Sequence, residues 1–205
     1  MGLSGNAGIL PASLSTMPVS QITYIVCLLV IAAIRLVELR VSSRNESQLK
    51  THGATKMPEP NYAAMVALHT GILIASAAEV VFLARPLIPW LALGMATVFV
   101  ATNGVRWWVI RTLAGRWSVH VVTPARGIVS TGPFRYVRHP NYSAVFVEMI
   151  AIPLLHTAWL TALVGAVAHI LVLRARVALE ESVLLADPDY RAAMASKPRF
   201  VPRLF

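Results

Sequence analysis

The sequence predicts an all-α integral membrane protein with about five transmembrane helices. Of its 205 residues, 57% are hydrophobic and only 13% are charged, and the mean hydropathy is +0.65. This number of charged side chains is too small to cover the surface of a water-soluble protein of this size. The lipid bilayer is therefore the expected solvent. The chain shows neither an internal repeat nor a low-complexity tract. We therefore predict a short polar lead over residues 1–18 and one membrane domain over residues 19–205.

Four apolar stretches define the expected spans, because a helix needs about 20 apolar residues to cross the bilayer core. Three of them have about this length: residues 19–37, 62–83 and 87–109. The fourth, residues 142–173, is too long for one ordinary span, and Pro153, His156 and Thr157 near its middle are expected to mark a turn. This stretch therefore predicts a C-terminal helical hairpin whose first arm is short enough to be tilted or incomplete.

The basic residues predict the orientation of these spans. Five, six and six Lys or Arg residues lie within residues 35–56, 106–138 and 174–203, and only Arg85 lies between the second and third spans. Five spans place the three rich segments on one side, which the positive-inside rule makes cytoplasmic. The N-terminus is then outside and the C-terminus inside.

The net charge of +9 has the same origin. In a membrane protein it indicates topology and contact with anionic membrane lipid, so a nucleic-acid partner is not expected. The single cysteine, Cys27, excludes an internal disulfide, and no oligomeric state is predicted.

The stretch GPFRYVRHPNY, which ends at Tyr142, places polar residues directly before the predicted hairpin. Pro140 favours the first turn of a helix, and it pushes His139 towards an extended conformation. Arg138 and His139 are therefore expected in an incoming loop, whereas Asn141 and Tyr142 belong to the first helical turn.

The start of such a helix is a candidate anion site. Its free N–H groups and the positive end of its dipole attract negative charge, and Arg138 adds a full positive charge. Tyr136 and Tyr142 offer aromatic faces for a cation or an adenine ring. The alternative is an interfacial belt, in which aromatic and basic residues only mark the headgroup region.

The hairpin returns the chain to the same side. Tyr142 and Glu180 are 38 residues apart, and the segment RARVALEES around Glu180 ends the fifth span. Arg176 and Glu180 share one helical face. Glu180 and Glu181 point about 100° apart, so they are not expected to serve one spot, and each should have a cationic or hydrogen-bonding partner. The alternative is a solvated helix end with an ordinary ion pair.

These pieces together resemble the signature of the isoprenylcysteine carboxyl methyltransferase family of integral membrane enzymes. The resemblance rests on RHPNY at residues 138–142, the hydrophobic hairpin, and the paired Glu180 and Glu181. The stretches LAGRWSVHV, IVSTGPFRYVRHPNY and LLADPDYRAAMASKPRFVP, with Tyr190 in the expected place, are similar too. The match covers roughly residues 105–205, which we expect to be the catalytic part.

Two details refine this resemblance. RLVELRVSSRN at residues 35–45 resembles bacterial members, so a bacterial inner membrane is the expected location. Phe134 stands where the family usually has a tyrosine.

The resemblance implies S-adenosylmethionine as methyl donor, bound by cytoplasmic loops, with no metal. The helix start and Arg138 suit its carboxylate, and His139 or one glutamate suits its adenine or ribose. The expected donor-binding residues are Gly132, Tyr136, Arg138, His139, Pro140, Asn141, Tyr142, Glu180 and Glu181.

The expected acceptor is a lipophilic small molecule that enters sideways from the bilayer. A hydroxyl of an alkylated phenol or pyrone is favoured over a prenyl-type carboxylate, and it would benefit from a base. Glu148, two turns into the fourth span, is the candidate base, and Arg176 is the second expected catalytic residue. The alternative for Glu148 is a structural hydrogen bond to His69, Asn103 or His169.

Two other functions stay open at this point. An NADPH-dependent enzyme of the membrane sterol-reductase type would have a somewhat similar C-terminal half. A non-enzymatic membrane scaffold or carrier is the other alternative. A carrier needs polar residues along a path across the bilayer, whereas the polar residues here gather at one face.

Overall fold

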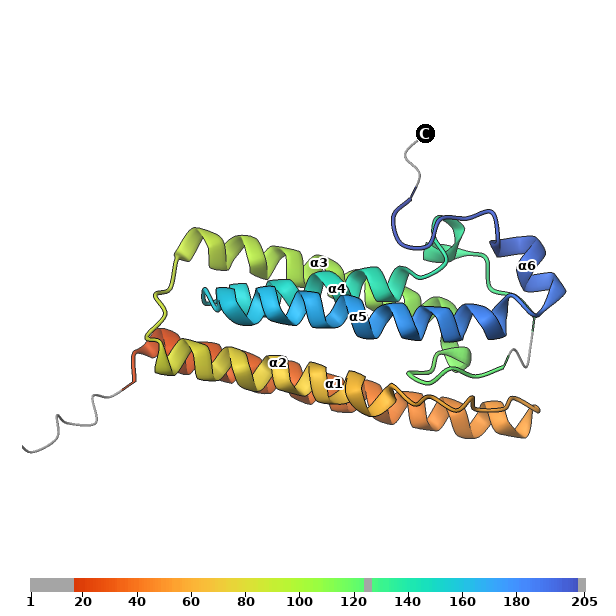
Figure 1. The fold of residues 1–205 in the computed structure, drawn as a ribbon, viewed down its shortest axis with the longest axis horizontal. Helices are drawn as coiled ribbons and strands as arrows, with labels where there is room; N and C mark the ends of the chain where they lie inside the picture. Colours follow the sequence, from red (N-terminus) through yellow and green to blue (C-terminus); the bar gives the residue numbers. More distant parts are fainter. Residues whose placement is uncertain (1–16, 124–126, 203–205) are drawn as a thin grey trace, which may run out of the picture.

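The computed structural model describes residues 17–123 and 127–202, and in these ranges the regular secondary structure is helical apart from one isolated bridge between Lys56 and Val122. The helices are α1 (Val19–Thr51), α2 (Tyr62–Phe82), α3 (Pro89–Leu113), η1 (Ala114–Arg116), η2 (Gly132–Arg135), α4 (Pro140–Leu154), α5 (Trp159–Leu184) and α6 (Pro188–Met194). The five long helices run side by side, and α6 covers one end (Figure 1). The predicted all-α membrane fold is confirmed. The predicted polar lead lies outside the described residues, except for residues 17 and 18.

Three of the described helices, α1, α2 and α5, are long and apolar enough to cross a membrane. The 33 residues of α1 span about 50 Å against a bilayer core of about 30 Å. The helices α1 and α5 therefore continue beyond the apolar stretches that end at residues 37 and 173, as polar helical extensions. The 15 residues of α4 span only about 22 Å, which agrees with the short first arm expected of the hairpin.

The ends of α4 lie where prolines were expected to place them. Pro140 occupies the first turn, and His139 is the N-cap residue with φ −125° and ψ 58°. Extended backbone has a ψ angle above about 100°, so the extended conformation predicted for His139 is wrong in its ψ angle. The helix ends at Leu154, and Thr157, with a positive φ of 57°, donates a hydrogen bond of 2.6 Å to the carbonyl of Pro86. The predicted turn between α4 and α5 is confirmed.

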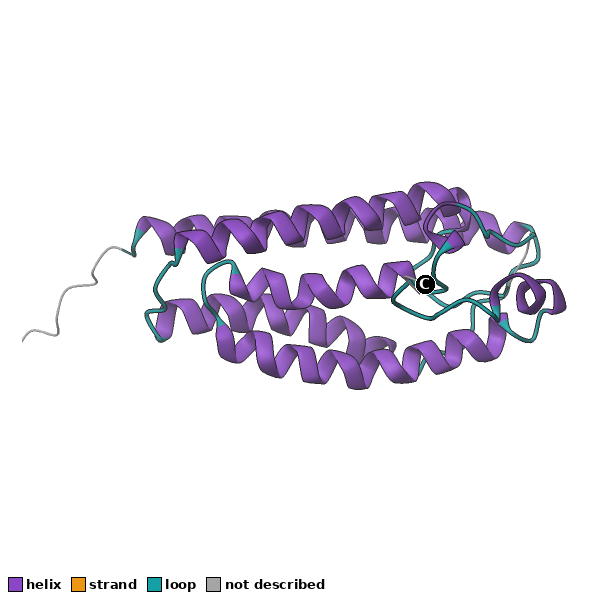
Figure 2. Cartoon of the chain, turned by 90° about the horizontal axis from the view of Figure 1, so that it is seen from above, coloured by secondary structure: helices purple, strands orange, loops and turns teal. Residues whose placement is uncertain are grey.

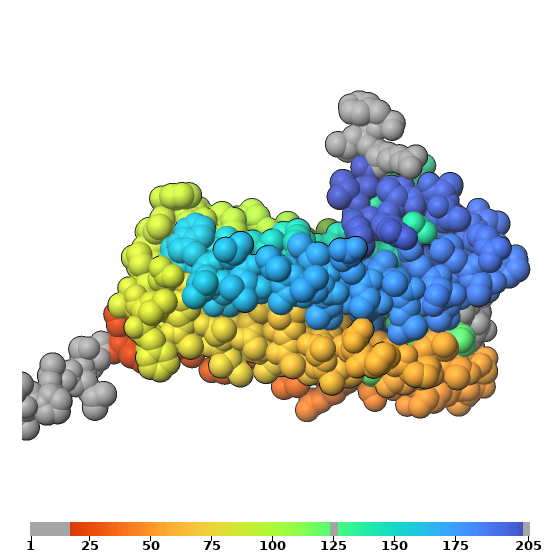
Figure 3. All heavy atoms as spheres, viewed as in Figure 1, coloured from red at the N-terminus to blue at the C-terminus, as the bar shows by residue number. Residues whose placement is uncertain are grey.

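The apolar core lies towards the end of the bundle where α1 begins. Its buried members are Tyr24, Leu28, Ile31, Ile72, Val80, Met149, Ile152 and Ala158. The hydroxyl of Tyr24 donates to the carbonyl of Ile152 at 3.1 Å, which ties α1 to α4. On one face of the molecule, α5 lies along α2 (Figure 3). This end of the molecule is therefore closed by packing.

The long connections gather at the opposite end (Figure 2). The α1–α2 connection pairs with the segment after η1, because Met57 N donates to Val121 O at 2.9 Å. The tail after α6 pairs with the loop before α4, where Arg138 N and His139 N each donate at 2.9 Å to the carbonyls of Pro198 and Arg199. The α1–α2 connection, the α3–α4 connection and the tail after α6 thus surround the start of α4 and the end of α5.

Candidate functional site

A cavity of about 580 Å³ leads from this looped end into the bundle. Its lining includes Pro140 at the first turn of α4 and Ile152, twelve residues further along the same helix, a rise of about 18 Å. Polar motif residues line one end, and apolar residues such as Leu36, Val66 and Leu73 line the other. Its volume lies within the roughly 300–1,000 Å³ typical of ligand sites.

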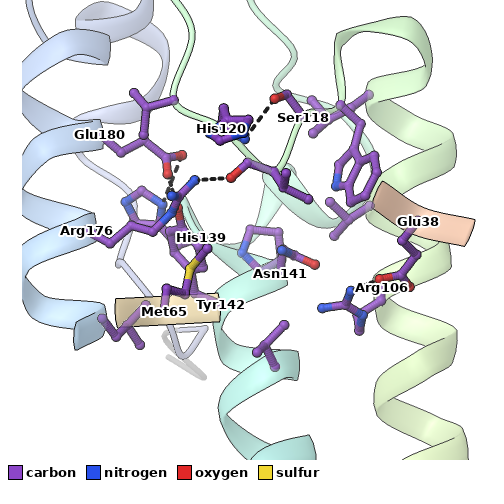
Figure 4. Close-up of a pocket in the computed structure, with 18 of the residues that line it drawn as sticks. Glu38, Met65, Arg106, Ser118, His120, His139, Asn141, Tyr142, Arg176 and Glu180 are labelled. Carbon is purple, nitrogen blue, oxygen red and sulfur yellow. Dashed lines mark hydrogen bonds and ion pairs between the residues drawn. The ribbon is translucent and has the colours of Figure 1, made fainter. Parts of the chain in front are cut away.

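A hydrogen-bond network centred on Tyr142 organises the mouth of the cavity (Figure 4). The Tyr142 hydroxyl donates to Glu180 and accepts a hydrogen bond of 2.8 Å from Arg176 Nε. The remaining donors of Arg176 bind the carboxylate of Glu59 and the carbonyl of Val119. The expected pairing of Arg176 with Glu180 is thus made through the tyrosine hydroxyl, and the network joins two helices, α4 and α5, to two loops.

His139 lies between the two adjacent glutamates. Its Nε2 is 3.1 Å from Glu181 Oε1, its Nδ1 is 3.8 Å from Glu180 Oε1, and the residue is only 3% exposed. The two carboxylates therefore face opposite sides of one imidazole, and only Glu180 lines the cavity, which agrees with the angle expected between them. Glu181 also binds Arg138 at 3.1 Å and Arg199 at 2.7 Å, and this hydrogen bond raises the pKa of the Arg199 guanidinium.

The predicted site residues separate into two groups. Those that line the cavity are Arg138, His139, Pro140, Asn141, Tyr142, Glu148, Arg176 and Glu180. Gly132, Tyr136 and Glu181 are not among the lining residues. Tyr136 is 52% exposed, and Glu181 lies behind His139. Gly132 has a φ of 57°, and a Cβ there would lie 2.6 Å from Thr112 Oγ1, so this glycine allows a tight turn against α3.

Two polar atoms at the mouth are buried without a hydrogen-bond partner in the described part of the chain: Asn141 Oδ1 and Arg138 Nε. Leaving such an atom unsatisfied costs about 1–3 kcal/mol, so its presence at a cavity wall needs an explanation. One is an acceptor and the other a donor. The mouth therefore suits a ligand that carries both kinds of group, as an amino acid or a nucleoside does.

Deeper in the cavity lies a charge quartet, which consists of Arg35, Glu38, Arg106 and Glu148. Arg35 bridges Glu38 and Glu148 at 2.8 Å each, and Arg106 binds Glu38 and has its Nε 3.6 Å from Glu148 Oε2. Glu38 and Arg106 lie on the opposite side of the cavity from Arg176 and Glu180 (Figure 4). The quartet carries no net charge, so the pairs offset one another inside the membrane.

The structural hydrogen bonds considered for Glu148 are not observed. Among the described residues it has arginine partners, whereas Asn103 donates to the carbonyl of Phe99, and His69 contacts the carbonyl of Met65. Glu148 Oε1 has no hydrogen-bond partner within the described ranges, although the side chain is completely buried. One carboxylate oxygen is therefore buried without a partner in a residue that lines the cavity.

Sequence reasoning missed Glu59, His120 and the arginines that bind Glu148. Glu59 Oε1 accepts a hydrogen bond of 2.8 Å from Val121 N and is 3.1 Å from His120 Nδ1. The chain separates Glu59 from Arg176 by 117 residues, so no local pattern reports this pair. The available signal was an acidic residue in a short loop on the arginine-rich side.

Tyr190 of α6 also lines the cavity. Burial, followed by the negative charge of Glu180, raises the pKa of its hydroxyl to about 12. The phenol therefore stays protonated at neutral pH and can donate a hydrogen bond.

Comparisons with known proteins agree with this geometry. A family model for the isoprenylcysteine carboxyl methyltransferase family matches residues 90–186. The uncharacterized protein YpbQ of Bacillus subtilis (strain 168) is 30% identical over 151 residues, which are 73% of this chain and 89% of the relative. An uncharacterized protein of Haemophilus influenzae is 31% identical over 156 residues, 75% of this chain and 90% of the relative.

A solved structure shares the fold. The eukaryotic intramembrane Ras methyltransferase ICMT superposes with a TM-score of 0.53 at 21% identity. The match covers 66% of this chain and 52% of the other, so this chain spans about half the length of that enzyme. This likeness concerns the fold, and the family model covers the RHPNY motif and the hairpin themselves. The chain belongs to the isoprenylcysteine carboxyl methyltransferase family.

Proposed function

We propose that the protein is an S-adenosylmethionine-dependent methyltransferase that acts on a lipophilic acceptor from the bilayer. The observation that carries this proposal is the single cavity that joins the RHPNY motif to apolar walls on α1, α2 and α4. A water-soluble donor and a membrane-dissolved acceptor can meet only in a cavity with two such ends. Enzymes of this family use S-adenosylmethionine, which supports the choice of donor.

The residues at the mouth fit such a donor. Arg138 Nε and the start of α4 suit a carboxylate, and Asn141 Oδ1 suits an amino group. When bound, S-adenosylmethionine supplies an electrophilic methyl group on a sulfonium. Tyr142 and Glu180 line the wall near that cation, and the loops before α2 and α4 exclude water.

Arg176 and Glu148 take different roles in this proposal. The donors of Arg176 are directed at Tyr142, Glu59 and Val119, so it acts as a positioning residue for Tyr142. Glu148 lines the cavity, its Oε1 has no partner among the described residues, and this oxygen takes the proton of the acceptor. A prenyl-type carboxylate would need a cation without another partner, and each arginine of the charge quartet is already paired with a glutamate. The quartet therefore favours an uncharged hydroxyl, as on an alkylated phenol or pyrone.

The location follows from the donor. S-adenosylmethionine is a cytoplasmic metabolite of high polarity, so the looped end must face the cytoplasm. Together with the basic residues at that end, this supports a bacterial inner-membrane protein with about five spans, N-terminus out and C-terminus in.

Ligand-induced thermal stabilisation tests the donor assignment. S-adenosylhomocysteine should raise the unfolding temperature of the purified protein in detergent, because a ligand that binds only the native state stabilises it. NADPH, the cofactor of the sterol-reductase alternative, should not. Tyr142→Phe removes the hydroxyl that joins Arg176 to Glu180 and should weaken donor affinity about tenfold or more, since hydrogen bonds to charged groups contribute about 1.5–3 kcal/mol.

Tyr136→Phe is the matched control, because this tyrosine is half-exposed and is not a lining residue. It should bind S-adenosylhomocysteine as the wild type does. Stabilisation by NADPH alone would replace the methyltransferase by a reductase, and stabilisation by neither ligand would favour the scaffold or carrier.

A further inference from the structure

Two histidines line the cavity on helices that do not carry the charge quartet. His69 of α2 and His169 of α5 meet edge to face, with ring centroids 5.3 Å apart. The ring of Phe146 lies 6.0 Å from His169, and Phe146 precedes Glu148 on α4 by only two residues. The histidine pair therefore lies at about the depth of Glu148, inside the apolar part of the bundle.

Both imidazoles line the cavity and carry nitrogen atoms that can form hydrogen bonds. His69 Nδ1 is 2.6 Å from the carbonyl of Met65, and a carbonyl can only accept, so Nδ1 carries the proton. In the neutral ring Nε2 is then an acceptor. His169 is 3% exposed, and in the described ranges neither of its ring nitrogens has a hydrogen-bond partner. A buried polar side chain of this kind is rare in proteins and indicates a partner of some sort.

The surroundings restrict what this partner can be. Leu73, Val145 and Leu173 line the same part of the cavity, so an ion there would lose its hydration without a countercharge. An uncharged oxygen avoids this cost. A hydroxyl can donate to His69 Nε2, and either a hydroxyl or a carbonyl can bond to His169.

We propose that His69 and His169 form a second polar subsite, which binds an uncharged oxygen of the acceptor other than the one that is methylated. The proposal rests on the proposed function in that it concerns the acceptor of the same cavity. It adds a requirement to that acceptor: a polar head with two oxygen functions, one directed at Glu148 and one at the histidine pair.

A set of three probes tests the subsite without methyl transfer. Dodecylbenzene, dodecylphenol and dodecylbenzenediol share one chain and differ in having no, one or two hydroxyl groups. Binding to the purified protein is measured at constant detergent for the wild type, His169→Phe and His156→Phe. His156 is the matched control, because it is 1% exposed and likewise lacks partners among the described residues, yet is not a lining residue.

The wild type should bind the diol more tightly than the phenol. His169→Phe should weaken diol binding about three- to tenfold, the usual contribution of a neutral hydrogen bond, and abolish the preference. His156→Phe should keep the preference. His169→Phe should unfold at no lower temperature than the wild type, since phenylalanine has a similar shape and no unpaired nitrogen.

If His169→Phe does not fold, His69→Phe on α2 is the replacement variant and should likewise lose the preference for the diol over the phenol. His169→Gln should retain part of that preference. Equal binding of the phenol and the diol by the wild type, or a preference that survives both phenylalanine variants, would overturn the subsite. Failure of S-adenosylhomocysteine to bind would instead contradict the methyltransferase and leave the diol preference standing.

Discussion

The two oxygens of Glu148 have different surroundings. Oε2 is held by Arg35 at 2.8 Å with Arg106 Nε at 3.6 Å, whereas Oε1 is buried at the cavity wall without a partner in the described chain. Glu38 differs because both of its carboxylate oxygens have arginine partners. Arg35 binds Oε1 and Oε2, and Arg106 also binds Oε2. The arginine-bound oxygen fixes the carboxylate, and the other oxygen can receive a proton.

This contrast gives a paired prediction. Glu148→Gln and Glu38→Gln each leave the two arginines with one carboxylate, so both should destabilise the protein, by up to the roughly 3–5 kcal/mol of an unpaired buried charge. Only Glu148→Gln should also lower turnover on a hydroxyl acceptor about 100-fold or more with donor affinity nearly intact, since an amide cannot take the proton. Turnover and unfolding temperature of both variants check this. Full turnover by Glu148→Gln would remove Glu148 from the mechanism.

At the scale of the elements, the start of α5 shows how a charge inside the bundle can be structural. The Glu79 carboxylate accepts hydrogen bonds from Leu160 N at 3.1 Å and from Thr161 N and Thr161 Oγ1 at 2.7 Å each, and it also binds Arg85. The carboxylate thus caps the free N–H groups of α5 from a neighbouring helix. It lies at the end of the bundle opposite the motif.

Replacing this cap should affect stability alone. Glu79→Gln is expected to lower the free energy of unfolding by about 1–2 kcal/mol, as the loss of a helix cap does, and to leave S-adenosylhomocysteine affinity unchanged. Thermal unfolding with and without this ligand measures both quantities. Asp189→Asn, an exposed carboxylate, is the control and should change neither. A loss of ligand affinity in Glu79→Gln would show that the two ends of the bundle are coupled.

The elements also show which features the sequence could predict. Pro140 and the turn near Pro153 were found because a proline acts on its own neighbours. The motif and the paired glutamates were found by resemblance. The arginine partners of Glu148 were not found, because Arg35 is 113 residues away and the pairing depends on how each helix is rotated. The pair of Glu59 and Arg176 was not found for the same reason, because these residues are 117 positions apart.

At the scale of the whole molecule, the charge distribution and the fold define the same axis. The basic residues lie in the connections around the start of α4 and in the halves of the long helices that lead to them, whereas Arg85 lies with Glu79 at the other end. The helices run between these two ends (Figure 1). A donor site at the basic end therefore predicts which end faces the cytoplasm.

Reporter fusions test this orientation. We expect the end ahead of α1 to lie outside the cytoplasm, so a reporter that works only outside should be active there. We expect the end after α6 to lie in the cytoplasm, so a reporter that works only inside should be active there. Paired phosphatase and fluorescent-protein fusions measure this in intact bacteria. Two reporters on the same side would contradict an odd number of spans.

The central claim is that this cavity transfers a methyl group from a cytoplasmic donor to a molecule from the bilayer. Methyl-labelled S-adenosylmethionine, incubated with the purified protein and a bacterial membrane lipid extract, tests it most directly. The account predicts label in an organic-soluble product with the wild type, and far less with Tyr142→Phe or Glu148→Gln at equal protein. Label that never leaves the aqueous phase, although the wild type binds S-adenosylhomocysteine, would contradict a lipophilic acceptor.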